Sequence, residues 1–209
     1  MTKVRKQLTL KELEPFVQDY HRAFPEWRVL ERTLIAREKG PVMQGIGFQC
    51  LSTGRYRPIC SIYYLCIPGR QGGFGVGFLK HPVQNIDPRA HERLRDNVVE
   101  AIHRESVPSV DAPLEPEQVL ALHEAREPIR SPDAHHLAAL NAYLGHNERA
   151  LYWCERFPAL VNQLGFGWQD FDLKRQTFLD DLKRWIQAGD AKSQLDRIVQ
   201  EERRQWGLA

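Results

Sequence analysis

The first periodic segment of the chain predicts an amphipathic helix from about Leu10 to Ala23. Thr9 is placed as its N-cap, and Glu12 follows three residues later, which is the spacing of a capping box. Pro25 marks its end, because proline lacks the N–H that a helix interior requires. Apolar side chains recur at three- and four-residue spacing, at Leu10, Leu13, Val17, Tyr20 and Phe24. This stripe gives the helix one face to bury.

Four segments then show the composition and the partial alternation of β-strands. They are rich in β-branched and aromatic residues and span residues 27–38, 42–52, 57–67 and 74–80. Gly40-Pro41 separates the first two segments, and Thr53-Gly54 turns the chain between the second and third. Short connections of this kind join antiparallel neighbours, so we expect an antiparallel meander of three to four strands.

Helical patterns dominate the rest of the chain. Asp87-Pro88 predicts a capped helix start, and its apolar face continues to about Glu105. Residues 107–117 hold three prolines and no periodicity, as a linker does, and residues 118–209 read as successive helices. The predicted fold class is α+β, with a sheet layer in residues 1–106 flanked by helices and a helical subdomain in residues 118–209.

Composition and charge narrow the function classes. The 209 residues are 42% hydrophobic and 27% charged, which is ordinary for a globular protein. The net charge is +2, but residues 1–110 carry 17 Lys+Arg and 11 Asp+Glu, whereas residues 111–209 carry 12 and 16. This asymmetry fits either an acidic partner for the first half or attraction between the halves. No apolar stretch approaches the length of a membrane span and no signal peptide is apparent, so we expect a cytoplasmic protein without a membrane partner.

No motif predicts a metal, a cofactor or a catalytic nucleophile. The four cysteines form no CxxC pair, so we interpret them as buried, reduced thiols. His81, Asp87 and His91 offer the one metal-like grouping, and surface histidines are the commoner explanation. No GxSxG segment is present. We therefore expect no cofactor and favour a non-enzymatic role, with a hydrolase whose catalytic residues lie far apart in the sequence as the remaining alternative.

The glycine-rich segment PGRQGGFGVGF, residues 68–78, poses the question of phosphate binding. It lacks the lysine and the Ser/Thr of a P-loop, and its GxGxG continues as strand rather than as helix. We therefore interpret it as a turn into an edge strand. Alternating Gly75 and Gly77 would expose backbone there, and a partner could add a strand to it.

A basic hairpin tip supports a second type of contact. Arg55, Tyr56 and Arg57 lie at one predicted turn, and Arg70 and Gln71 lie at the next. Arginines interleaved with an aromatic residue suit phosphate contact and base stacking, whereas a polar turn with a sideways-packed aromatic ring is the structural alternative. These five residues, with Gly75 and Gly77, are the partner-binding candidates of the sequence.

Two resemblances bear on function. The segment LAALNAYLGHNERALYWCERFPAL, residues 137–160, resembles one helical hairpin of the tetratricopeptide type, without a second copy. The order of elements, with MQGIGFQ as a central strand and YLGHNERAL in the tail, resembles small cytoplasmic bacterial immunity proteins of toxin–immunity loci. This resemblance implies a non-enzymatic protein-binding module that neutralises a toxin. Nucleic-acid binding or processing through the basic N-terminal half is the alternative.

Overall fold

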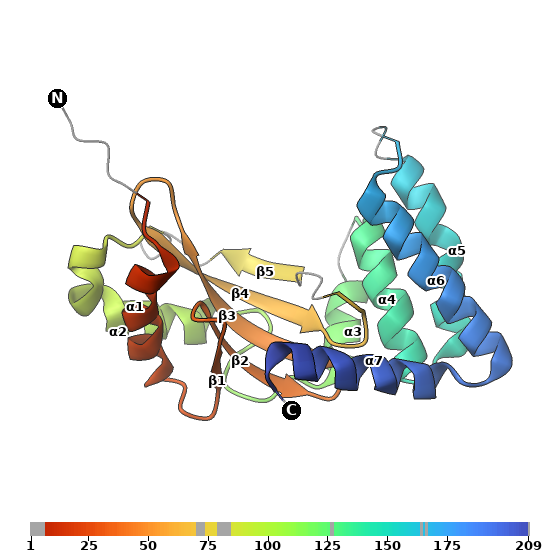
Figure 1. The fold of residues 1–209 in the computed structure, drawn as a ribbon, viewed down its shortest axis with the longest axis horizontal. Helices are drawn as coiled ribbons and strands as arrows, with labels where there is room; N and C mark the ends of the chain where they lie inside the picture. Colours follow the sequence, from red (N-terminus) through yellow and green to blue (C-terminus); the bar gives the residue numbers. More distant parts are fainter. Residues whose placement is uncertain are drawn as a thin grey trace. The chain divides into compact units, whose positions relative to one another are not determined.

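The computed structural model describes residues 7–69, 74–78, 85–125, 128–163, 165 and 167–208 of the chain. An antiparallel sheet is followed by helices, which confirms the predicted α+β fold class and the helical C-terminal part (Figure 1). Within this described part, no helix is long and apolar enough to cross a lipid bilayer.

The sheet has the strand order β1-β2-β3-β4-β5, so each strand pairs with its neighbours in sequence. Its strands are β1 (Arg28–Leu30), β2 (Leu34–Lys39), β3 (Val42–Cys50), β4 (Tyr56–Tyr64) and β5 (Phe74–Phe78). The segment predicted as one strand over residues 27–38 therefore contains two strands. Glu31 and Arg32 join them with φ values of 51° and 63°, so two residues with side chains occupy left-handed backbone. A turn without Gly or Asn left no sequence signal for this hairpin.

Eight helical elements lie in the described residues, and the first two begin at the capping residues that the sequence predicts. They are α1 (Leu10–His21), the short 3-10 helix η1 (Pro88–Ala90), α2 (His91–Glu105), α3 (Pro116–Glu124), α4 (Ser131–Tyr143), α5 (Asn147–Asn162), α6 (Asp170–Ala188) and α7 (Ala191–Trp206). The Thr9 side chain accepts the Glu12 N–H at 3.3 Å, and the Glu12 carboxylate accepts the Thr9 N–H at 2.8 Å. The capping box predicted from the sequence is therefore confirmed. Asp87 caps η1, which leads directly into α2.

The chain divides into two compact units. The first comprises Met1–Lys39, Met43–Tyr63 and Gly72–Leu114, and the second comprises Gly40–Val42, Tyr64–Gln71 and Glu115–Ala209. Each unit has its own buried interior, so each is described separately below.

In the first unit, α1 and α2 cover one face of the sheet (Figure 1). Their buried side chains join those of the strands in one cluster, which includes Leu13, Val17, Tyr20, Ile35, Ile46, Phe48, Tyr56, Val98 and Ile102. Because β4 alternates buried and half-buried residues, its even-numbered side chains share one face of the strand, and those of Tyr56 and Cys60 join this cluster.

The proline-rich stretch that the sequence predicts as a linker packs on this first unit. The buried Gln44 side chain donates to the carbonyl oxygens of Pro108 at 3.2 Å and Ser109 at 2.9 Å. Val110 and Leu114 are buried as well. These bonds satisfy the Gln44 amide, which would be costly to bury without acceptors, and they hold the stretch in place.

Gly45 in β3 permits a close approach on the opposite face of the sheet. A Cβ atom at this position would lie 2.7 Å from Leu34 Cδ1 and 2.9 Å from Tyr63 Cε2. At Gly47, two residues along the same strand, the nearest atom to such a Cβ lies 3.8 Å away. Gly45 is therefore required by packing, whereas Gly47 has space for a methyl group.

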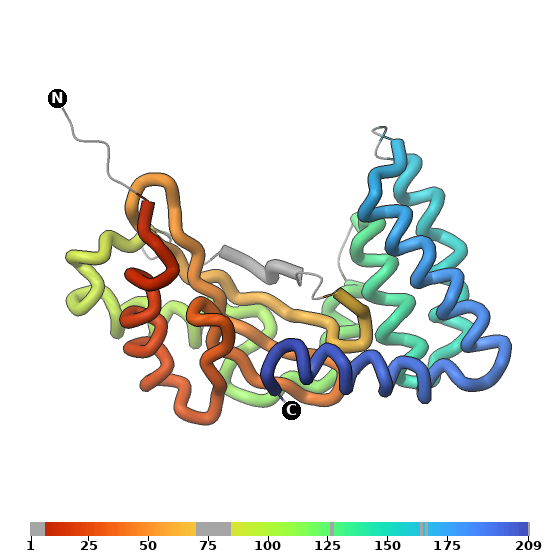
Figure 2. Tube along the Cα trace, in the orientation of Figure 1, coloured from red at the N-terminus to blue at the C-terminus, as the bar shows by residue number. Residues whose placement is uncertain are grey.

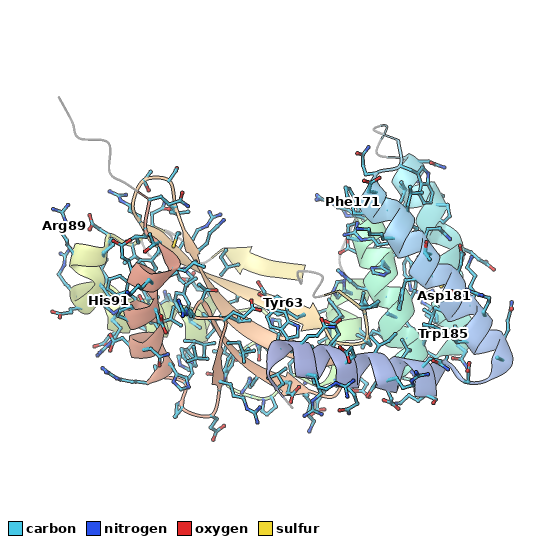
Figure 3. All side chains as sticks on the ribbon, viewed as in Figure 1. Tyr63, Arg89, His91, Phe171, Asp181 and Trp185 are labelled. Atoms are coloured by element: carbon cyan, nitrogen blue, oxygen red, sulfur yellow. The ribbon has the colours of Figure 1, made fainter. Side chains whose placement is uncertain are left out.

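In the second unit, α4 is the central helix. It packs against α3, α5, α6 and α7, and eleven of its thirteen residues are buried. Figure 2 follows α4 and α5 as the two arms of a helical hairpin. Gly145 makes the turn between them with a φ of 83°, and Gly189 ends α6 in the left-handed conformation. Figure 3 marks Phe171 and Trp185 toward opposite ends of α6.

Candidate functional site

The predicted basic hairpin tip is only partly available for contacts. Arg55 is exposed, and the Arg57 Nε donates to Gln49 Oε1 at 2.8 Å. Tyr56 lies between them in sequence but is fully buried. Its side chain therefore lies in the core of the first unit, where it cannot stack on a base as the nucleic-acid hypothesis required.

The glycine-rich segment contributes a strand at the end of the sheet order. Gly77 pairs with Cys60 and Gly75 pairs with Ser61, so Val76 is the extra residue of a bulge between them. Arg70 and Gln71, the other two candidates of this region, lie outside the described residues, as does His81. The backbone of β5 therefore fits the expected terminal strand, and residues 70–73 of the expected turn lie outside the described residues.

A buried hydrogen-bond chain links α1, β4 and α2. The hydroxyls of Tyr20 and Tyr56 are 3.1 Å apart, the Tyr56 hydroxyl is 2.6 Å from His91 Nδ1, and His91 Nε2 is 2.8 Å from an Asp19 carboxylate oxygen. Figure 3 marks His91 in the region of α1 and α2. Phe16 stacks on Tyr56 with ring centroids 5.3 Å apart. These contacts place the hydroxyls of Tyr20 and Tyr56 and the ring of His91 in the core of the first unit.

The pKa values of the side chains in this hydrogen-bond network favour a structural role for them. Burial raises the pKa of Tyr20 to about 12 and raises that of Tyr56 as well, so both phenols stay protonated. Burial alone would raise the pKa of Asp19, but the hydrogen bond from His91 and the charge of Arg95 lower it overall. Only the Asp19 end reaches a surface depression, of about 560 Å³. The arrangement holds no exposed nucleophile.

A second buried polar cluster lies in the helical unit. The Tyr64 hydroxyl shares a hydrogen bond with His123 Nε2, and the Tyr64 ring stacks on His136 with centroids 4.3 Å apart. His135, the residue before His136 in α4, is fully buried and has no hydrogen-bond partner on either ring nitrogen within the part of the chain that the structure describes. Burial lowers the pKa of His135 to about 3 and lowers that of His136 well below its ordinary value.

The cysteines and histidines do not assemble a metal site in the described ranges. No three His, Cys, Asp or Glu side chains are placed there to hold an ion. Cys60, Cys66 and Cys154 are buried free thiols, and Cys50 is half-buried. Burial raises the pKa of Cys66 and of Cys154 to about 12, which leaves both thiols protonated and unreactive at neutral pH.

A cluster of aromatic and charged side chains lies on α5. Arg149, Tyr152, Trp153 and Arg156 follow i, i+3, i+4, i+7 spacing, which places them on one face of the helix. We call these four residues the α5 surface. They line a surface depression of about 660 Å³, whose remaining wall includes the apolar side chains of Pro128, Ile129 and Leu160.

The α5 surface holds its cations over its rings. The Arg149 guanidinium carbon lies 4.8 Å from the Tyr152 ring centre and 5.1 Å from that of Trp153, and that of Arg156 lies 5.5 Å from Tyr152. Arg156 also donates to the Tyr152 hydroxyl at 2.7 Å, and Arg149 donates to Glu124 at 3.1 Å. Tyr152 is nevertheless 38% exposed. Stacking on rings orients both guanidiniums without burying them.

Comparisons with protein-family models, curated proteins and solved structures find no match. The α5 surface was not among the candidates from the sequence, because its segment was interpreted only as a helical hairpin. Its signal was present as two arginines and two aromatic residues at helical spacing in RALYWCER, residues 149–156.

Proposed function

We propose that this chain is a non-enzymatic protein-binding module and that the α5 surface is its interface. The observation that carries this proposal is the exposed Tyr152 ring, with two guanidiniums over it, beside a depression with apolar walls. Tyr, Trp and Arg supply most of the binding energy at protein interfaces, because rigid rings and planar guanidiniums bury large area at small entropic cost.

The finer proposal is that the partner is a toxin that the chain neutralises. Its support is the resemblance of the element order to immunity proteins, together with MQGIGFQ in β3 and YLGHNERAL across the turn from α4 to α5. An immunity protein acts by occluding its toxin and needs no catalytic group of its own. The buried, protonated phenols and thiols described above agree with such a role.

The test is co-expression of the full chain with each protein encoded by the neighbouring genes, followed by gel filtration and calorimetry. We expect a saturable complex with one of them that a Tyr152→Ala/Arg156→Gln double variant weakens by at least about tenfold. Arg184→Gln is the matched control, because Arg184 is an arginine of α6 with a 74% exposed side chain. Complex formation with none of these proteins, or equal affinity of the double variant, would overturn the proposal.

Nucleic-acid binding through Arg55 and Arg57 is the competing proposal. It has lost the stacking contribution of Tyr56, which is buried. Affinity for mixed-sequence DNA that falls steeply with salt and is lost in an Arg55→Gln/Arg57→Gln variant would favour it over protein binding.

Strand addition at β5 is a second route to a protein partner. It follows from the terminal position of β5 in the sheet and from Gly75 and Gly77 in its backbone. A Gly75→Val/Gly77→Val variant that folds normally but loses the partner, while the α5 variant retains it, would move the interface from α5 to this edge.

A further inference from the structure

The donors of the α5 surface are only partly used. Arg156 is exposed, and its one hydrogen bond within the described residues goes to the Tyr152 hydroxyl, which leaves most of its five N–H donors without a protein acceptor there. Arg149 is 47% exposed and has one carboxylate, that of Glu124, at 3.1 Å. A guanidinium held in place by a ring and lacking a bidentate acceptor is preorganised for a carboxylate.

A buried donor gives an independent indication. Trp153 is 3% exposed and lines the depression, and its indole Nε1–H has no acceptor in the ranges that the structure describes. Buried N–H groups are nearly always paired, and an unpaired one costs free energy in the folded chain. An acceptor supplied by a partner, after a small shift of the side chains above the indole, would remove that cost.

Beside Gln163, the rest of the lining is apolar. Leu160 is buried, and Pro128 and Ile129 contribute hydrocarbon surface beside it. A carboxylate alone would leave this wall in contact with water. A ligand that fits the whole depression therefore carries an apolar side chain next to its negative charge.

The surrounding charge argues against a polyanion. Glu148 and Glu155 are exposed on the same helix, each adjacent in sequence to one of the two arginines, and residues 111–209 carry 16 Asp+Glu against 12 Lys+Arg. A phosphodiester chain would be repelled by this surface outside the two arginines. A short segment with one or two carboxylates meets only the local positive charge.

We infer that the α5 surface binds a short acidic segment of a protein partner, in which an aspartate or glutamate stands beside a leucine or phenylalanine. The carboxylate pairs with Arg156 and Arg149, and the apolar side chain lies against Leu160, Pro128 and Ile129. This inference rests on the proposed function, because it names the chemistry of the partner at the proposed interface.

The test uses the full chain and a fluorescein-labelled twelve-residue peptide in which a single Glu-Leu-Glu-Phe is flanked by Gly and Ser residues. Controls are the same peptide with Gln for each Glu and a single-stranded twelve-nucleotide DNA. We expect saturable anisotropy at moderate salt, at least about tenfold weaker binding of the Gln peptide, and a similar weakening by Arg156→Gln. Arg184→Gln should bind as the unaltered chain does. Equal affinity for the Gln peptide, tighter binding of the DNA or no effect of Arg156→Gln would each overturn the inference.

A nitrogen–proton correlation spectrum supplies the second readout. The chain has five tryptophans and hence five indole N–H signals, and Trp153→Phe identifies the one of interest. Added acidic peptide should move this signal in the direction of a stronger hydrogen bond, and the Gln peptide should not. The peptide does not bind in one possible outcome, while the Tyr152→Ala/Arg156→Gln variant loses a complex that the unaltered chain forms with a whole protein. In that case the acidic-segment inference is wrong and the proposed function stands. If both experiments fail, the interface itself is wrong.

Discussion

Acid should destabilise the helical unit through its buried histidines. His135 is fully buried without hydrogen-bond partners among the described residues, and burial lowers its pKa from 6.5 to about 3. The unfolded chain therefore takes up a proton near pH 6.5, whereas the folded chain takes it up only near pH 3. The stability that neutral His135 contributes is complete above pH 6.5 and falls as the pH decreases through this window.

The magnitude follows from proton linkage. Below pH 6.5, each further pH unit favours the unfolded chain by about 1.4 kcal/mol per such histidine, so His135 alone accounts for about 2 kcal/mol between pH 7 and pH 5. His136 further reduces the stability of the folded chain at low pH, because burial and the nearby His135, His123 and Arg175 also lower its pKa. Domains are stable by only about 5–15 kcal/mol, so the combined effect is large.

Urea unfolding followed by tryptophan fluorescence measures this loss. Four of the five tryptophans, Trp153, Trp168, Trp185 and Trp206, lie in the helical unit, so the signal reports mainly on it. His135→Leu should reduce the difference in unfolding free energy between pH 7 and pH 5 by about 2 kcal/mol, whatever it does to stability at pH 7. Leu173→Gln, at an exposed position that carries no titratable group, should leave the difference unchanged. Parallel pH curves for the unaltered chain and His135→Leu would refute the reasoning.

Three further predictions concern packing, backbone and thiols. Gly45→Ala should lower the free energy of unfolding by about 1–3 kcal/mol because its methyl group overlaps Leu34 and Tyr63, while Gly47→Ala should change this free energy much less. Urea titrations of the two variants measure the difference, and equal effects would contradict the packing argument. Arg32→Gly should raise stability by about 1 kcal/mol by relieving left-handed backbone, and a lower melting temperature would contradict this. Ellman's reagent at pH 8 should react quickly with at most one thiol of the folded chain, that of Cys50, and with four thiols in urea. Rapid reaction of more than one thiol in the folded chain would show that the buried cysteines are accessible.

Local rules accounted for much of the fold. The capping box of α1 and the Asp87-Pro88 start need only residues three positions apart, so their geometry follows from short sequence patterns. The hairpin at Glu31 and Arg32 escaped prediction because its turn residues are ordinary ones held in left-handed backbone by the pairing of β1 with β2. Tertiary pairing decided the conformation there, and the local residue types did not indicate it.

The candidate site was harder to predict, because exposure depends on packing. The sequence placed three residues at one exposed turn, namely Arg55, Tyr56 and Arg57. Strand alternation instead points the Tyr56 side chain into the core, beside Tyr20 and His91. The helical spacing of Arg149, Tyr152, Trp153 and Arg156 was visible in the sequence. That Tyr152 stays exposed while Trp153 is buried follows only from the arrangement of the neighbouring helices.

Photo-crosslinking from position 152 reports directly whether the α5 surface is the interface. Benzoylphenylalanine replaces Tyr152 in the full chain, and separate chains carry it at Arg55 and at Lys183, whose side chain is 30% exposed on α6. With a neighbouring-gene product that forms the proposed complex, we predict a crosslink from position 152 that excess acidic peptide suppresses, and none from position 183. A crosslink from position 55 alone, or equal crosslinks from positions 152 and 183, would contradict the account of the α5 surface as the interface.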